Sequence, residues 1–164
     1  MPGVKLLSGG EKEEYLKVDV VGVYPILFES GGAGFVMLLE APEWKGKVLP
    51  IYIGVSEGVA IQNALNGVRT ERPMTHDLII NILEALGVSV ERITIDALLN
   101  NSVYTATIVL RKGDEQKGER LFIDARPSDS VAIALRAGAP IYVASHLERL
   151  ARRPEELGFK EENE

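Results

Sequence analysis

Cysteine is absent from the 164-residue sequence. This absence excludes disulfide bonds, cysteine-ligated zinc and a cysteine nucleophile. Long apolar runs are also missing, since none approaches the roughly 20 residues that a membrane-spanning helix needs. The first residues turn acidic too soon for a signal peptide. We therefore expect a soluble, cytoplasmic protein.

Basic residues are scarcer than acidic ones. The 18 lysines and arginines face 24 aspartates and glutamates, which gives a net charge of −6 and an isoelectric point of about 5.1. A protein that grips nucleic acid by its phosphates ordinarily presents a basic face. The charge balance therefore argues against a broad nucleic-acid-binding surface and leaves room only for a local basic patch.

Several nucleotide and metal motifs are missing as well. The sequence has no phosphate-binding loop, no G-x-G-x-x-G dinucleotide fingerprint and no H-E-x-x-H zinc motif. The glycine-rich run 31–34 precedes a predicted strand rather than a helix, which is typical of a hairpin turn.

The apolar residues, 46% of the chain, follow strand and helix periodicities in turn. We expect strands at 18–28, 35–40, 48–53, 88–98, 102–111, 119–125 and 140–143. We expect helices at 56–65, 75–86, 127–137 and 147–153, with Thr75 as the N-cap of the second. A loose N-terminal leader (1–16), a single domain (17–153) and an acidic C-terminal tail (154–164) complete the predicted organisation.

The same periodicities predict which side chains form the core. The expected core residues are Val20, Val23, Leu38, Ile51, Ile61, Ile79, Leu83, Ile95, Ile108, Ile123, Val131 and Ile133. Trp44 lies in a predicted turn and is expected to be exposed or half-covered.

An internal repeat is the most informative feature of the sequence. When Ser56 is set against Ser128, 72 positions further on, segment 18–61 lies over 90–133 without a gap. The two segments are identical at 13 of 44 positions, whereas average composition gives about one in fifteen by chance. We therefore predict an α+β fold of two duplicated βββα units, joined by helix 75–86, with mixed or antiparallel sheets and packed helices.

The two copies differ most where the third strand meets the helix. The first copy reads Tyr52-Ile53-Gly54-Val55 there, and the second reads Asp124-Ala125-Arg126-Pro127. Asp124 and Arg126 are two apart on a strand and should share a face. The start of the following helix is a ready site for an anion. The second copy is therefore the candidate functional junction.

Two interpretations of this junction remain open. In the first, Arg126 holds a phosphate with help from Ser128, while Asp124, Asp129 and Glu57 hold a divalent metal such as Mg or Mn. In the second, Arg126 pairs with one of the aspartates as structure, and the acids at the helix starts complement the helix dipole.

A second polar segment precedes the helix at 75–86. Arg69 and Arg72 are candidates for substrate binding. His76 is a candidate general base or metal ligand. The alternative is a surface histidine in the first turn of a helix, and Asp77 is explained by the helix dipole.

Several strings together resemble the signature of the bifunctional-nuclease domain family, once classed as a domain of unknown function. They are 124–133, 138–143, 49–54 with Glu57-Gly58, and 75–78, in order over about 17–145. The resemblance implies an α+β fold, DNase and RNase activity and a homo-oligomer, with a dimer as the first expectation. The positions that match the polar motifs of the family are Glu57, His76, Asp77, Asp124, Arg126, Ser128 and Asp129.

The sequence is therefore consistent with two functions. The first is a metal-assisted nuclease that acts on DNA or RNA, with His76, Asp124, Arg126 and Asp129 as the catalytic residues. The second is a non-catalytic regulatory or ligand-binding oligomer. Convergence of Glu57, His76, Asp124 and Asp129 in one cleft would favour the nuclease.

Overall fold

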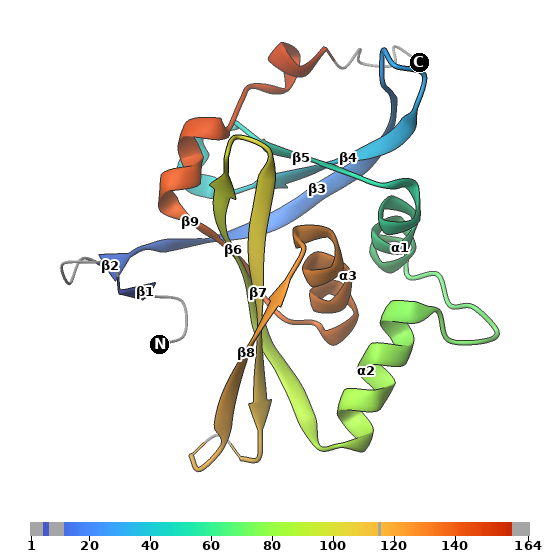
Figure 1. Cartoon of the computed structure of the whole chain (residues 1–164), viewed down its shortest axis with the longest axis vertical. Helices are drawn as coiled ribbons and strands as arrows, with labels where there is room; N and C mark the ends of the chain where they lie inside the picture. Colours follow the sequence, from blue (N-terminus) through green and yellow to red (C-terminus); the bar gives the residue numbers. More distant parts are fainter. Residues whose placement is uncertain (1–4, 7–11, 115, 159–164) are drawn as a thin grey trace.

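A seven-stranded mixed sheet forms the body of the computed structural model, which describes residues 5–6, 12–114 and 116–158 (Figure 1). The strand order is β5-β4-β3-β9-β6-β7-β8. Neighbouring strands run antiparallel except β6 and β9, which are parallel. The strands are β3 (Tyr15–Leu27), β4 (Ala33–Glu40), β5 (Leu49–Ile53), β6 (Val88–Leu99), β7 (Val103–Lys112), β8 (Glu119–Ala125) and β9 (Ile141–Ala144).

Three α-helices within the described residues lie together on one side of this sheet (Figure 1). They are α1 (Val55–Leu65), α2 (Thr75–Ala85) and α3 (Pro127–Ala137). Both α1 and α2 pack against α3. The predicted α+β class, with a mixed sheet and packed helices, is confirmed.

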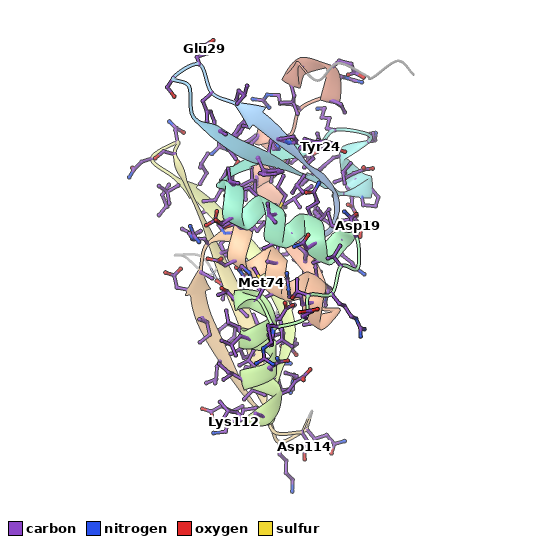
Figure 2. All side chains as sticks on the ribbon, turned by 90° about the vertical axis from the view of Figure 1, so that its right-hand side faces the viewer. Asp19, Tyr24, Glu29, Met74, Lys112 and Asp114 are labelled. Carbon is purple, nitrogen blue, oxygen red and sulfur yellow. The ribbon has the colours of Figure 1, made fainter. Side chains whose placement is uncertain are left out.

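Each half of the chain runs through three sequential antiparallel strands into a helix. The first half is β3-β4-β5-α1 and the second is β6-β7-β8-α3, with β9 between them in the sheet. The first hairpins pair differently, since Leu27 faces Ala33 whereas Leu99 faces Val103. The common origin of the two halves therefore stays a prediction. The β3–β4 and β7–β8 hairpins, marked by Glu29 and Asp114, reach opposite ends of the molecule (Figure 2).

Proline and glycine set the bounds of α3. Pro127 opens the helix, where its missing N–H leaves nothing unsatisfied, and Gly138 ends it with a left-handed φ of 67°. The predicted N-cap of α2 is wrong by one residue. Met74 holds the cap position, and the carboxylate of Asp77 accepts the backbone N–H of Met74 at 3.0 Å. Thr75 is thus the first helical residue.

Most of the predicted core is confirmed. Eight of the expected residues are buried, namely Val23, Leu38, Ile51, Ile61, Ile95, Ile108, Val131 and Ile133. Val20, Ile79 and Leu83 are partly buried against this core. Ile123 is a wrong prediction, with 43% of its surface exposed, because β8 is the last strand of the sheet.

The prediction for Trp44 is wrong in the opposite direction, because this residue was expected to be exposed or half-covered and is buried. Its surface is only 2% exposed, because a short 3-10 helix, η1 (Pro42–Trp44), turns its side chain into the core.

The ends of the domain differ from the predicted bounds. The strand β3 begins at Tyr15, within the range assigned to the leader. A separate antiparallel pair, β1 (Lys5–Leu6) and β2 (Lys12–Glu13), precedes it. The remainder of the predicted leader, 1–4 and 7–11, and residues 159–164 of the tail lie outside the described residues.

The predicted helix at 147–153 is instead a 3-10 helix, η2 (Ser145–Leu150). A further 3-10 turn, η3 (Pro154–Leu157), follows within the range assigned to the tail. Across the described part of the chain, every helix falls short of the length and hydropathy that crossing a bilayer requires.

Candidate functional site

The candidate site is a cleft where the beginnings of three helices meet. Glu57 lies in the first turn of α1, His76 in that of α2 and Asp129 in that of α3, while Arg126 caps α3. The cleft has a volume of about 640 Å³. Its lining residues are Ser56, Glu57, Val59, Ala60, Asn63, Met74, Thr75, His76, Ile79, Arg126, Asp129 and Arg136.

Arg126 bridges two carboxylates that lie 72 positions apart in the sequence. Its Nε donates to Oδ2 of Asp129 at 2.9 Å, and its Nη2 donates to Oε1 of Glu57 at 3.2 Å. The hydrogen bond to Asp129 is the largest cause that raises the pKa of the guanidinium. The side chain is nevertheless 65% exposed. The cleft therefore presents a fixed cation to solvent.

Asp129 uses its second oxygen to hold His76. The distance between Nε2 of His76 and Oδ1 of Asp129 is 2.9 Å, and the histidine side chain is only 12% exposed. Partial burial raises the pKa of Asp129, but the hydrogen bonds from His76 and Arg126 outweigh it, so the pKa lies below its usual range. A carboxylate accepts from Nε2–H, which leaves the lone pair of a neutral ring on Nδ1.

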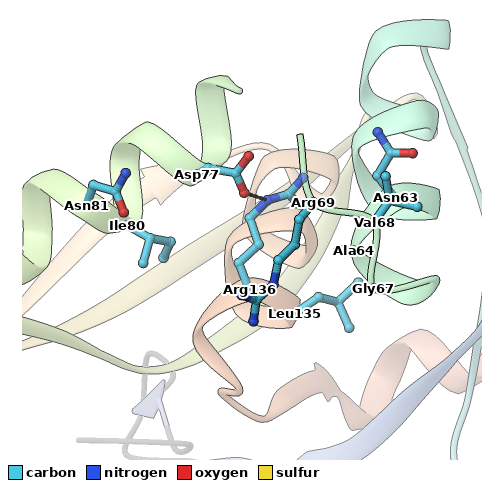
Figure 3. A pocket seen from close by; sticks show the side chains of 10 residues that line it. All are labelled: Asn63, Ala64, Gly67, Val68, Arg69, Asp77, Ile80, Asn81, Leu135 and Arg136. Atoms are coloured by element: carbon cyan, nitrogen blue, oxygen red, sulfur yellow. Dashed lines mark hydrogen bonds and ion pairs between the residues drawn. The ribbon is translucent and has the colours of Figure 1, made fainter. Parts of the chain in front are cut away.

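Arg136 locks the three helices together beside this cleft. Its Nε donates to Oδ1 of Asp77 at 2.7 Å, and its Nη groups donate to the carbonyl oxygens of Ala132 at 3.0 Å and Ala60 at 3.1 Å. Figure 3 shows the hydrogen bond between Arg136 and Asp77. It is the largest cause that lowers the pKa of Asp77. Asp77 also caps α2, so this ion pair is structural.

The structure separates other predicted site residues from the cleft. Asp124 is exposed on β8 opposite Thr107, because β8 ends at Ala125 and Arg126 already caps α3. Strand alternation therefore no longer relates Asp124 to Arg126. Ser128 is buried in the first turn of α3. Arg69 lines a neighbouring cavity, and Arg72 is exposed in the segment before α2.

Convergence of four residues in one cleft was expected of a nuclease. Glu57, His76 and Asp129 line one cleft, and Asp124 does not.

The residues in the cleft do not fit a divalent cation as they are arranged. Within the described ranges, no group of three or more histidine, aspartate or glutamate side chains is placed to hold a metal. The guanidinium of Arg126 already lies between the carboxylates of Glu57 and Asp129. The metal stays a prediction from the sequence.

Sequence reasoning missed three polar residues of the cleft, namely Ser56, Asn63 and Arg136. Arg136 had no local signal, because its partner Asp77 is 59 positions away. Ser56 does lie in a recognisable motif. Residues 54–58 read Gly-Val-Ser-Glu-Gly, which is the G-x-S-x-G spacing of a nucleophile elbow between a strand and a helix. That elbow holds its serine in a strained turn. Ser56 is instead the second residue of α1 and does not have a positive φ.

The fold and the cleft define an α+β protein with a polar site at the starts of its helices. The sequence model of the bifunctional nuclease domain matches residues 36–155, and the chain belongs to this family. An uncharacterized protein of Mycobacterium tuberculosis is 45% identical over 97 residues, which cover 59% of this chain and 54% of that protein.

Plant relatives are more distant. Bifunctional nuclease 1 of Oryza sativa subsp. indica is 25% identical over 107 residues, or 65% of this chain and 32% of that protein. Bifunctional nuclease 2 of Arabidopsis thaliana is 24% identical over 111 residues, or 68% of this chain and 33% of that protein. The matched region thus spans about half of the mycobacterial relative and about a third of the plant ones.

Proposed function

We propose that this protein hydrolyses phosphodiester bonds of DNA or RNA in the cleft between α1, α2 and the start of α3. The observation that carries the proposal is the convergence of Glu57, His76, Arg126 and Asp129 from three helix starts onto one cleft. Membership of the bifunctional nuclease domain family supports it, as do the names of the plant relatives.

In this mechanism Arg126 binds a non-bridging oxygen of the phosphodiester and stabilises the charge that develops there. His76 accepts a proton at Nδ1 from the attacking water, whose oxygen forms the new bond to phosphorus. Asp129 holds the ring through Nε2 and stabilises the imidazolium. The bond from phosphorus to the leaving sugar oxygen breaks, and that oxygen takes a proton from solvent.

One observation favours the second candidate, a non-catalytic ligand-binding module. Both arginines that line the cleft are already paired with carboxylates, Arg126 with Glu57 and Asp129, and Arg136 with Asp77. These carboxylates already take the Nε donor and one Nη2 donor of Arg126, so a phosphate must share the guanidinium with them or displace one of them. Substrate binding is therefore expected to be weak and strongly salt-dependent.

The two candidates differ in the behaviour of Arg126 and His76. We expect cleavage of fluorescently labelled single-stranded DNA or RNA by the wild type, and a loss of about 100-fold or more for His76→Ala and for Arg126→Ala. Arg126 is exposed, so Arg126→Ala should leave the melting temperature nearly unchanged. Arg153→Ala removes an exposed arginine outside the cleft and serves as the matched control.

Full activity of Arg126→Ala, or its unfolding, would show that Arg126 is a structural ion-pair partner. An inactive wild type, tested with and without Mg²⁺ or Mn²⁺, would support the binding module. Activity that persists in EDTA would show that a metal is not required.

A further inference from the structure

A second cavity lies beside the cleft, between the end of α1, the first two turns of α2 and the end of α3 (Figure 3). Its volume is about 360 Å³, within the range of roughly 300–1,000 Å³ usual for small-ligand pockets. Asn63 and Arg136 line both cavities, so the two are adjacent. The residues that line the second cavity are Asn63, Ala64, Gly67, Val68, Arg69, Asp77, Ile80, Asn81, Leu135 and Arg136.

The second cavity is locally cationic, although the chain as a whole carries a net charge of −6. Asp77 and Arg136 neutralise each other through their 2.7 Å hydrogen bond. Arg69 is the remaining charged residue of the lining, and its guanidinium has no ion-pair or hydrogen-bond partner within the part of the chain that the structure describes. Unlike Arg126, Arg69 can therefore offer all of its N–H donors to an anion.

The rest of the lining suits a ligand that is part polar and part apolar. Asn63 and Asn81 offer side-chain amides, which both donate and accept hydrogen bonds. Val68, Ile80 and Leu135 supply an apolar wall. A nucleotide combines these properties, because its phosphate is anionic, its base has an apolar face and its base edges carry donors and acceptors.

We propose that this cavity is a nucleotide subsite in which Arg69 binds a phosphate, Asn63 and Asn81 contact a base edge, and the apolar wall packs against the base. The proposal rests on the proposed nuclease function, because the subsite would hold the nucleotide next to the bond cleaved at His76. Arg136 lies between the two cavities and is held in place by three hydrogen bonds. A single-stranded nucleic acid bound in both cavities would therefore contact a fixed side chain where it passes from one to the other.

Binding and hydrolysis separate the subsite from the cleavage mechanism. The probes are adenosine 5′-monophosphate and a phosphorothioate-linked tetranucleotide, titrated calorimetrically at low and at moderate salt. We expect saturable binding that weakens with salt, with the tetranucleotide bound more tightly than the mononucleotide because it spans both cavities. Arg69→Ala should weaken both by about tenfold or more, the loss of one charge-assisted phosphate contact.

Three variants complete the experiment. Arg153→Ala should bind as the wild type does, and His76→Ala should bind normally while it loses hydrolysis. In the nuclease assay Arg69→Ala should raise KM with little change in kcat, since Arg69 does not reach the reacting atoms.

Unchanged binding by Arg69→Ala would overturn the subsite, and so would tighter binding of the mononucleotide than of the tetranucleotide. An absence of hydrolysis combined with Arg69-dependent binding would overturn the nuclease function alone.

Discussion

At the scale of single residues, Glu91 is an acidic side chain that two arginines stabilise in its charged form. Glu91 lies at a bulge in β6, between Val90 and Arg92. It accepts hydrogen bonds from Arg120 at 2.9 Å and from Arg111 at 2.6 Å. The hydrogen bond from Arg120 is the largest cause that lowers the pKa of Glu91 to about 2.

This lowered pKa makes Glu91 a source of acid sensitivity. A carboxylate whose pKa is depressed by folding contributes stability above its unfolded pKa, about 4.3, and loses it as the pH falls through the folded value. We expect Glu91→Gln to lower the free energy of unfolding at pH 7 by about 1–2 kcal/mol, after allowance for solvent screening. Urea denaturation at pH 7 and at pH 3 measures this change.

The difference between Glu91→Gln and the wild type should shrink as the pH falls from about 4 towards 2. Glu43→Gln, an exposed acid with no hydrogen-bond partner in the described segments, is the control and should behave as the wild type does. An equal loss of stability at every pH would show that packing, rather than charge, gives Glu91 its role.

The charged residues of the cleft were predictable to different degrees. Helix-start preferences and the divergence between the two copies pointed to Glu57, His76, Arg126 and Asp129, and these converge. Asp124 was chosen by strand alternation, a rule that stops applying where β8 gives way to the cap of α3. No local pattern could find Arg136, because only the packing of α2 on α3 brings it to Asp77.

At the scale of elements, Gly58 sets how closely α1 packs on the sheet. A Cβ atom at this position would overlap the ring of Phe35 on β4. Gly58 is buried, and Phe35 belongs to the main core. The close approach of α1 and β4 therefore depends on the absence of a side chain.

We expect Gly58→Ala to lower the free energy of unfolding by roughly 1–3 kcal/mol through overpacking. The better helix propensity of alanine, about 1 kcal/mol, should not offset this loss. Thermal unfolding measures the change. Gly32→Ala is the matched control, because its Cβ would meet only Phe28 Cδ2 at 3.7 Å, an ordinary contact. A Gly58→Ala variant as stable as the wild type would show that α1 can move away from β4 without cost.

Elements were easier to predict than the surroundings of their side chains. Proline and glycine gave the bounds of α3, and both its ends and those of β8 match the prediction. Periodicity identifies the faces of a strand but not what covers them. Ile123 alternates as a core residue should, yet β8 is an edge strand. Trp44 lies in a turn, yet the 3-10 helix η1 buries it.

At the scale of the whole molecule, α2 is apolar on two sides. Ile79, Ile80 and Leu83 pack against the core. Residues spaced by four along the same helix form a second stripe, which is between 49% and 67% exposed and consists of Met74, Leu78, Ile82 and Leu86. Met74 lies at the start of this stripe (Figure 2). A helix that is apolar on both sides ordinarily has both sides covered in its working state.

We expect a second copy of the chain to cover this stripe, because apolar, self-complementary surfaces are typical of homodimers. A charge in the stripe should then separate the copies. Light scattering at micromolar concentration should give the mass of a dimer for the wild type and of a monomer for the double variant Leu78→Glu and Ile82→Glu. Leu27→Glu, at a residue 84% exposed on the β3–β4 hairpin, should remain dimeric.

A monomeric wild type, or a wild-type dimer that the double variant does not disrupt, would contradict this dimer surface. The helix α2 also carries His76, the proposed general base. A dimer formed through the exposed stripe of α2 would hold this histidine in position in the cleft. The monomeric double variant should therefore also lose nuclease activity.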